Sequence, residues 1–236
     1  MAVLDKLRAT KKYGLIPYES DEDEHSIEMQ YPYIKLVTEG RENVSIVPVI
    51  VGELTPTTAR ELAQHFLPYM RDDENFFVIS SDFCHWGQRF RYKPYQDQGE
   101  RIWECIKQLD RKGMDLIEKL DLEGFYNYLE ETENTICGRN PILLFLAIVE
   151  AYNKERAAAG TSTIAGASEA APSVAEGVSE TKSEADSELA FKFIHYAQSD
   201  KVKKPSDHSV SYAAGAAYPC ACASGDVAAS TGQTKE

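Results

Sequence analysis

The chain has no long apolar run, since its longest stretch, Ile142 to Val149, is far shorter than the roughly 20 residues of a membrane-spanning helix. Its first residues also lack the apolar core of a secretory signal peptide. Cysteine is scarce, with five scattered residues among 236, which excludes the disulfide framework of a small secreted protein. We therefore expect a soluble protein of the cytoplasm, and also of the nucleus, with no membrane span and with reduced thiols.

Basic residues are also few, because 25 lysines and arginines face 38 acidic residues and leave a net charge of −13. Proteins that bind nucleic acid usually carry a basic stripe, so no nucleic-acid partner is expected. A small basic cluster of Arg89, Arg91 and Lys93 fits either a solvated turn or a phosphate-binding group. The composition, with 43% hydrophobic and 10% aromatic residues, still predicts a globular core.

Strands are predicted where short apolar runs are rich in β-branched or aromatic residues, namely Val44–Val51, Phe76–Ile79, Leu189–Tyr196 and Ser209–Ala213. The first of these has the composition of a central strand that is buried on both faces. Helical spacing of apolar residues predicts helices over the first dozen residues, the first half of 24–36 up to Pro32, 55–70, 102–113, 114–120, 125–129 and 142–152. Strands that alternate with helices predict an α/β fold with a sheet flanked by helices.

Two stretches differ in composition from the rest. Residues 157–188 are filled with Ala, Ser, Gly, Thr and Glu and contain no aromatic residue, so we predict a disordered low-complexity insertion. Residues 219–236 are predicted to be a disordered tail, whose Cys220 and Cys222 are a weak metal signal. The folded domain is therefore expected to comprise residues 1–156 and 189–218.

The most informative motif is Ser-Ser-Asp-Phe-Cys-His-Trp-Gly at 80–87, directly after the predicted strand that ends at Ile79. In open α/β sheets, ligands bind where strands end, and this end would present Asp82, Cys84 and His85. A carboxylate can orient or accept a proton, an imidazole exchanges one near neutral pH, and a thiol can ligate metal. A polar turn with one solvated histidine explains the same pattern.

Cys137 is a second candidate, placed between two predicted helices and followed by Gly138 and Arg139. A helix N-terminus and a neighbouring guanidinium both favour a thiolate, the form of cysteine that reacts and binds metal. The alternative is a small buried apolar thiol, which is the more frequent environment of a single cysteine.

The block Ser80–Tyr92 resembles the signature of the Memo family (mediator of ErbB-driven cell motility), whose members are similar to class III extradiol dioxygenases. Four more blocks resemble the family in the same order: Asp21–Met29, Asn134–Arg139, Tyr196–Ser199 and Ser209–Gly215. The resemblance implies a Memo-like, extradiol dioxygenase-like α/β domain, of which this chain would hold the C-terminal two thirds.

The resemblance also implies a site. Cys137 matches a metal ligand that replaces the carboxylate ligand of the dioxygenases, and Asp82 and His85 match catalytic acid–base residues beside the metal. The binding pocket would add four residues, Glu24, His25, Cys84 and Arg89, although a histidine in a capping turn explains His25 equally well. The family's two other metal ligands are histidines of its N-terminal third, and no histidine of this chain matches them. We therefore expect the chain to be N-terminally incomplete.

Three functions follow from the resemblance. The first is a metal-linked redox activity coupled to signalling and cell motility, with copper or iron in the complete protein, because thiolate and imidazole ligands suit these metals. The second is a non-catalytic adaptor that binds phosphotyrosine peptides of receptor kinases and cytoskeletal regulators. The third is an inactive truncated fragment that is stable only with a partner or not at all. This chain by itself is expected to bind redox metal weakly or to hold none. Ring cleavage is not expected, because Cys137 stands in place of the carboxylate ligand.

Overall fold

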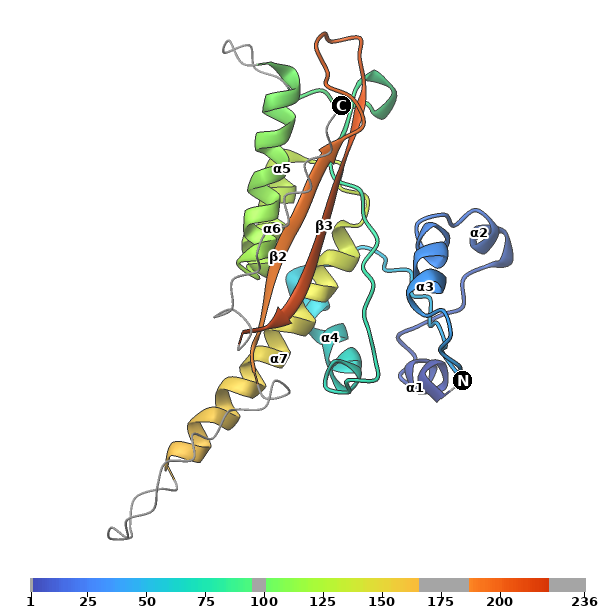
Figure 1. Cartoon of the computed structure of the whole chain (residues 1–236), viewed down its shortest axis with the longest axis vertical. Coiled ribbons are helices and arrows are strands. Elements are labelled where there is room, and N and C mark those ends of the chain that lie inside the picture. The colour runs from blue at the N-terminus through green and yellow to red at the C-terminus, as the bar shows by residue number, and fades with distance from the viewer. Residues whose placement is uncertain (1, 95–100, 166–186, 221–236) are drawn as a thin grey trace.

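The computed structural model describes residues 2–94, 101–165 and 187–220. The fold is mixed α/β, and its described strands form one small antiparallel sheet in the order β1-β3-β2 (Figure 1). The strands are β1 (His85–Trp86), β2 (Leu189–Gln198) and β3 (Ser209–Pro219). The predicted strands at 189–196 and 209–213 are confirmed, and both are longer than predicted.

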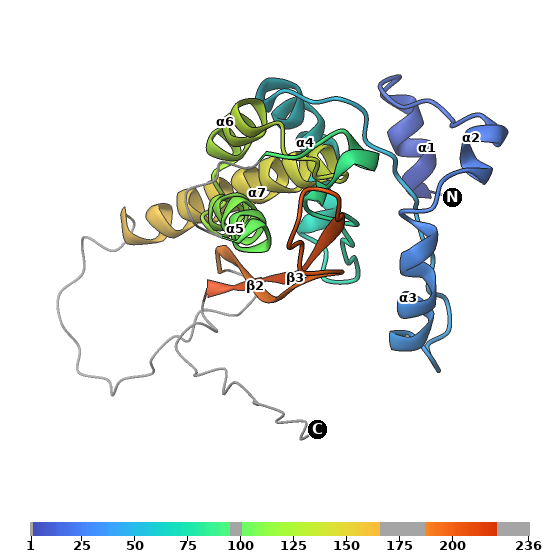
Figure 2. The ribbon, with the colours of Figure 1, turned by 90° about the horizontal axis from the view of Figure 1, so that it is seen from above.

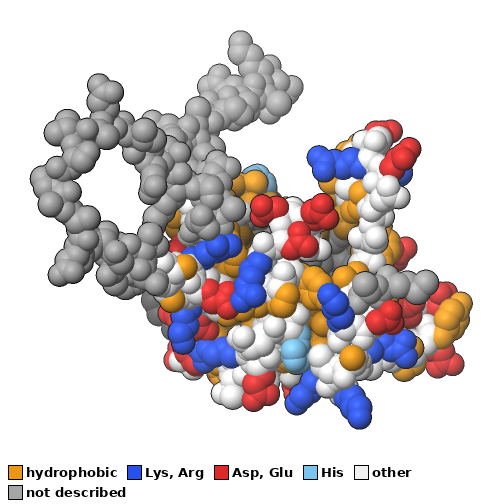
Figure 3. Space-filling view, turned by 90° about the horizontal axis from the view of Figure 1, so that it is seen from below, with side chains coloured by type: hydrophobic (Ala, Val, Ile, Leu, Met, Phe, Trp, Pro, Cys, Tyr) orange, Lys and Arg blue, Asp and Glu red, His pale blue; other side chains and the backbone are white. Residues whose placement is uncertain are grey.

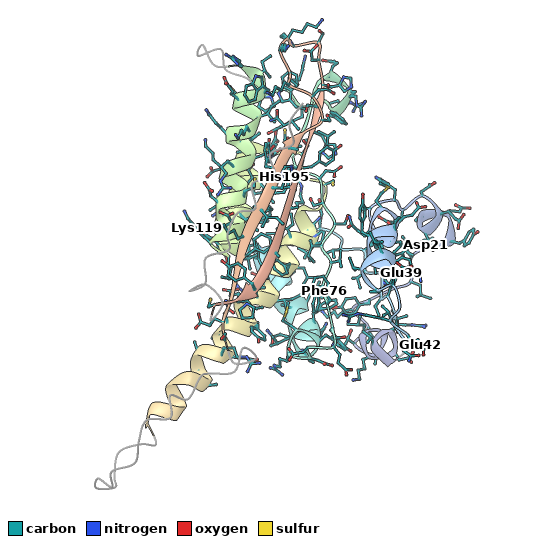
Figure 4. The ribbon with its side chains drawn as sticks, viewed as in Figure 1. Asp21, Glu39, Glu42, Phe76, Lys119 and His195 are labelled. Carbon is teal, nitrogen blue, oxygen red and sulfur yellow. The ribbon has the colours of Figure 1, made fainter. Side chains whose placement is uncertain are left out.

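The hairpin of β2 and β3 is the main part of the sheet. Its pairing runs from Leu189 opposite Pro219 to Gln198 opposite Ser211, with a shift of register between Phe193 and His195. The start of β2 is fixed to a helix by Asn153, whose side chain accepts from the Leu189 amide at 2.7 Å and donates to the Leu189 carbonyl at 2.8 Å. Figure 4 shows His195 on this strand.

Helices cover one face of the hairpin (Figure 2). They are α4 (Pro56–Met70), α5 (Ile102–Glu118), α6 (Leu122–Thr132) and α7 (Arg139–Ala165). Helix α4 begins as predicted, with Pro56 in its first turn and with Thr55 and Thr58 forming a capping box. The main core lies between α4, α6 and α7, where Ala59, Ala63 and Leu146 are fully buried. In the described part of the chain, no helix has the length and apolar character needed to cross a bilayer.

The N-terminal lobe comprises α1 (Ala2–Ala9), α2 (Tyr18–Glu22), the 3₁₀ turn η1 (Glu28–Gln30) and α3 (Tyr31–Val37), and it stands beside the helical core (Figure 2). The prediction that Pro32 ends a helix is wrong, because this proline lies in the first turn of α3, where its missing N–H costs no hydrogen bond. His65 of α4 is half-buried, and its Nδ1 lies 3.0 Å from the Tyr13 hydroxyl of the N-terminal lobe.

Two predicted strands are not strands in the structure. Residues 44–51 and 76–79 are extended, but the described residues offer their backbones no sheet partner. The prediction that 44–51 is buried on both faces is also wrong, since Ile46 is 47% exposed and Ile50 is 52% exposed. Phe76, which Figure 4 labels, is 90% exposed. Composition favoured strands here, but a strand also requires a neighbouring backbone to pair with. Without one, several apolar side chains of these two segments are exposed.

Helices α5, α6 and α7 extend beyond their predicted ends; α6 spans Leu122–Thr132, whereas the sequence predicts 125–129. Helix α5 does not end at Gly113 but continues to Glu118, so the helices predicted at 102–113 and 114–120 are one helix. Gly113 instead allows a close approach of the Tyr128 ring, since a Cβ there would lie 2.8 Å from Tyr128 Cε1. Helix α7 continues to Ala165, so residues 157–165 of the predicted insertion are helical. The remainder of the predicted insertion at 166–186 and most of the predicted tail, 221–236, lie outside the described residues.

Candidate metal centre

Hydrogen bonds attach the first site segment, residues 80–86, to the beginning of β3. The Phe83 amide donates to the Ser211 carbonyl at 2.8 Å, and the Ser211 amide donates to the Cys84 carbonyl at 3.0 Å. Phe83 and Trp86 are buried in two different apolar clusters on either side of this segment. Backbone pairing and buried aromatic anchors together fix where Asp82 and His85 lie.

The second site segment, residues 134–138, connects α6 to α7 and lies against the first. Thr135 joins the two, because its hydroxyl accepts from the His85 amide at 2.7 Å and donates to the His85 carbonyl at 3.0 Å. The Gly138 amide donates to Ser81 Oγ at 3.0 Å. Only a residue without a side chain fits there, since a Cβ on Gly138 would lie 2.4 Å from Ser81 Cβ and 2.5 Å from the Ser80 carbonyl oxygen.

Asp82, His85 and Cys137 meet where the two segments touch. Their ligand atoms, a carboxylate oxygen, an imidazole nitrogen and a sulfur, all lie within 4.8 Å of one another. His85 Nε2 is 3.6 Å from Asp82 Oδ2. The Asp82 amide donates to Cys137 Sγ at 3.1 Å, and Sγ also lies 3.8 Å from the Asp82 carbonyl oxygen, so the sulfur is held against the backbone of residue 82.

The orientation of His85 is set by its other ring nitrogen. His85 Nδ1 lies 2.8 Å from the Thr135 carbonyl oxygen, and because a carbonyl can only accept, Nδ1 carries the hydrogen. The hydrogen bond to Asp82 raises the pKa of His85; burial opposes this effect, and the Thr135 carbonyl adds to it. Nε2 therefore faces Asp82, available to a proton or to a metal ion. Metal-binding histidines commonly show this arrangement of one anchored and one free nitrogen.

The predicted pocket residues lie in different places. Cys84 is fully buried with Trp86, away from the three donor atoms, and burial raises the pKa of its thiol strongly. It is therefore a core thiol, because residue 84 faces the second apolar cluster while His85 faces the site. Arg89 is exposed, with its guanidinium carbon 4.4 Å from the Phe90 ring centre; that ring is 5.2 Å from the His85 ring.

Glu24 and His25 belong to a turn of the N-terminal lobe. The Glu24 carboxylate accepts from the Ser26 amide at 2.8 Å and from the Ile27 amide at 2.9 Å. Burial would raise the pKa of Glu24, but these bonds and one from the Ser26 hydroxyl outweigh it and lower the pKa. His25 is exposed, and the Ser26 carbonyl accepts from Ser80 Oγ at 2.8 Å. This turn therefore supports the first site segment through its backbone.

The sequence analysis makes no prediction for three buried polar residues that lie in or next to the two site segments. Asp110 on α5 is fully buried, as are Asn134 and Ser211. Asp110 gives one usable signal, since it lies four residues after Ile106 and four before Met114, on the apolar stripe of an amphipathic helix. An acidic residue on such a stripe is rarely buried without a specific partner.

The comparisons with known proteins agree with one another. The family model described as "Memo-like protein" matches residues 1–216. The chain is 40% identical over 215 residues to "Protein memo-1 homolog" of Caenorhabditis elegans, a match that covers 91% of this chain and 53% of that protein. It is also similar to "Protein MEMO1" of Xenopus laevis, at 40% identity, and of Homo sapiens, at 37%, in each case over 91% of this chain and 62% of the relative. The chain thus spans between about half and two thirds of the length of these relatives, and it belongs to the Memo family.

Proposed function

We propose that Asp82, His85 and Cys137 hold a copper or iron ion, and that this site supports a metal-linked redox activity coupled to signalling and cell motility. The observation that carries the proposal is the meeting of three different donor atoms within 4.8 Å, from residues up to 55 positions apart. Family membership and the resemblance of the sequence to Memo proteins support the link to motility.

The donor set fits these metals better than the harder alternatives. A thiolate and an imidazole suit copper(I) or iron(II), whereas magnesium and calcium prefer oxygen ligands alone. Cys137 is exposed and Asp82 is half-buried, so an ion can reach the donors from solvent. When bound, such a metal supplies one-electron redox chemistry.

The residues around the ion have separate tasks. The Asp82 amide holds the Cys137 sulfur in position, while the Thr135 carbonyl keeps the hydrogen of His85 on Nδ1 and directs Nε2 toward the site. The Asp82 carboxylate can exchange a proton with Nε2 when no ion occupies that nitrogen. Ring cleavage of the extradiol type is not proposed, because a fold resemblance alone does not carry an activity.

Titration with copper(I) against a competing chelator tests the proposal. We expect weak binding of one ion per chain, abolished by Cys137→Ser. Cys105→Ser is the control, because Cys105 is a half-buried cysteine of α5 outside the three donors, and this variant should bind as the unaltered chain does. Submicromolar binding that persists in Cys137→Ser would contradict the proposal.

One observation favours a second candidate, an adaptor for phosphotyrosine peptides. Arg89 lies over Phe90, and Phe90 contacts His85, so a guanidinium is held near the rim of the site where it could pair with a phosphate. An adaptor needs no metal. Fluorescence polarisation should then show binding of a phosphotyrosine peptide in the presence of a chelator, lost in Arg89→Gln and absent for the unphosphorylated peptide. Binding of neither metal nor peptide would favour an inactive fragment.

A further inference from the structure

A buried carboxylate lies behind the candidate site. Asp110 has no exposed surface, and its two oxygens accept hydrogen bonds from four different parts of the chain. Oδ1 accepts from the Cys84 amide at 3.2 Å and from Asn134 Nδ2 at 3.2 Å. Oδ2 accepts from the Tyr196 hydroxyl at 2.8 Å, and the Ser211 side chain is a further hydrogen-bond partner of the carboxylate.

These partners include both site segments. Cys84 lies between Asp82 and His85, and Asn134 begins the segment that carries Cys137. A single oxygen of Asp110 therefore contacts each of the two segments whose spacing determines how far the three donor atoms are apart. Helix α5 supplies the carboxylate, and the sheet supplies two further hydrogen bonds to it, from Tyr196 on β2 and Ser211 on β3.

The side chain of Asn134 is oriented by the hydrogen bonds that its NH2 group donates. Its Nδ2 donates to Asp110 and, at 2.7 Å, to the Tyr128 hydroxyl, which itself donates to the Leu109 carbonyl at 2.9 Å. Its Oδ1 is buried and has no partner in the described part of the chain. A buried acceptor without a partner destabilises a fold, so an apolar side chain would suit this core position better unless the amide donors are needed.

The four donors match what a carboxylate can accept, because each of its oxygens offers about two acceptor positions. Burial raises the pKa of Asp110, and the hydrogen bonds from Ser211, Tyr196, Asn134 and the Cys84 amide oppose that effect. An amide in place of the carboxylate would present an NH2 group to at least one of these donors. Asp110→Asn therefore changes the bonding with almost no change in size.

We propose that Asp110 is a positioning residue that sets the spacing between the 80–86 and 134–138 segments, and through it the geometry of Asp82, His85 and Cys137. The inference rests on the proposed function in one respect only, since that function gives the three residues a ligand. Asp110 contacts the Cys84 backbone and the Asn134 side chain, so it acts through these residues and is not a ligand itself.

The test compares Asp110→Asn with Asp115→Asn in the full chain. Asp115 lies on the same helix but is only half-buried, and it pairs with Arg111 at 2.6 Å, so the same substitution there should leave the site unchanged. Asn134→Ala removes the link from the other segment and keeps the test decisive if Asp110→Asn does not fold. The double variant shows whether the two residues act through the same bond.

Two readouts are measured on each variant. Hydrogen exchange of the Asp82 and His85 amides reports the contact between the segments directly, because these amides donate to Cys137 and Thr135. Copper(I) affinity, measured by chelator competition, reports the donor geometry. We expect Asp110→Asn and Asn134→Ala each to speed exchange at these two amides, while exchange within α5 is unchanged, and to weaken copper(I) binding roughly 10- to 100-fold. The double variant should be no worse than the more severe single variant.

The failures of the two proposals are distinguishable. If the unaltered chain binds no copper(I), the proposed function fails, and the exchange of the two amides still decides the role of Asp110. Unchanged exchange at Asp82 and His85 in folded Asp110→Asn would overturn the positioning role. Exchange that rises equally throughout α5 would also overturn it, because that result indicates a general loss of stability.

Discussion

The close contact at Gly138 gives the sharpest prediction. In Gly138→Ala the new Cβ would lie 2.4 Å from Ser81 Cβ, 2.5 Å from the Ser80 carbonyl oxygen and 2.6 Å from Ser81 Oγ. Carbon atoms in contact are normally about 3.5–4.0 Å apart, so the two site segments must separate by about 1 Å. Rotation of Ser81 cannot relieve the clash, because the Ser80 oxygen belongs to the backbone.

That separation would break the contacts that unite the site. The Gly138 amide to Ser81 Oγ bond of 3.0 Å and the Asp82 amide to Cys137 Sγ bond of 3.1 Å would both exceed hydrogen-bond length. Overpacking of this kind typically costs about 1–3 kcal/mol of unfolding free energy. In a chain of this size each kcal/mol lowers the melting temperature by about 2–4 °C. Metal affinity should fall roughly 10- to 100-fold, as when other groups that orient ligands are altered.

Urea unfolding followed by circular dichroism measures the stability, and copper(I) competition measures the site. Gly52→Ala is the control, because a Cβ there would meet nothing within 4 Å, and it should leave both quantities unchanged. If Gly138→Ala keeps the stability and metal affinity of the unaltered chain, the two segments are not held as closely as described, and the argument for a preformed site fails.

Other predictions concern titration, surface and the hairpin. Asp82→Asn should lower the pKa of His85 toward its ordinary value, as measured by NMR titration. Because the pKa of His85 is raised in the folded protein, the stabilisation from the Asp82–His85 pair is fully present below about pH 6.5. It is lost as the pH rises through the folded pKa. Protons compete for Nε2, so copper(I) affinity should fall as the pH falls through that pKa, and a pH-independent affinity would exclude His85 as a ligand. Ile46→Thr with Val78→Thr should reduce binding of an apolar dye and self-association while changing stability by only about 0.5 kcal/mol, whereas unchanged dye binding would mean that these side chains are covered. Asn153→Ala should lower the unfolding free energy by about 1–3 kcal/mol without changing metal affinity, and an equal loss of metal affinity would show that the hairpin start and the site are coupled.

The surface adds a reason to examine association. Figure 3 shows acidic, basic and apolar side chains interspersed on one face. In the two segments 44–51 and 76–79, which have no described sheet partner, Val49, Val51 and Phe77 pack against the core. The large apolar side chains of these segments that are exposed are Val44, Ile46, Ile50, Phe76, Val78 and Ile79. Such segments are prone to pair with other strands, so the dye-binding measurement should be repeated over a range of protein concentrations.

Local signals predicted the elements that depend on local physics. Thr55 and the first-turn Pro56 indicated the start of α4, and short runs rich in β-branched or aromatic residues indicated β2 and β3, although not their pairing. The same reasoning failed where a distant partner decides the outcome. Residues 44–51 have the composition of a strand but no described partner. Gly113 is predicted to end a helix because glycine is common there, but in the structure it leaves room for the Tyr128 ring.

The candidate site shows the same division. The chemistry of Asp82, His85 and Cys137 could be recognised from residue type and from the family resemblance. Their approach to within 4.8 Å depends on Thr135 and Gly138, which carry no chemical signal of their own. The role of Asp110 is still less visible, because its partners come from four separate segments, and no local pattern shows that they converge.

The pair of hydrogen bonds from Asn153 to the backbone of Leu189 also bears on how this protein can be engineered and how its relatives can diverge. Because a side chain from the middle of α7 holds the beginning of β2, the sequence that connects the two elements need not hold the hairpin in place. An affinity peptide inserted between α7 and β2 should therefore leave the start of the hairpin in place, as long as Asn153 is kept.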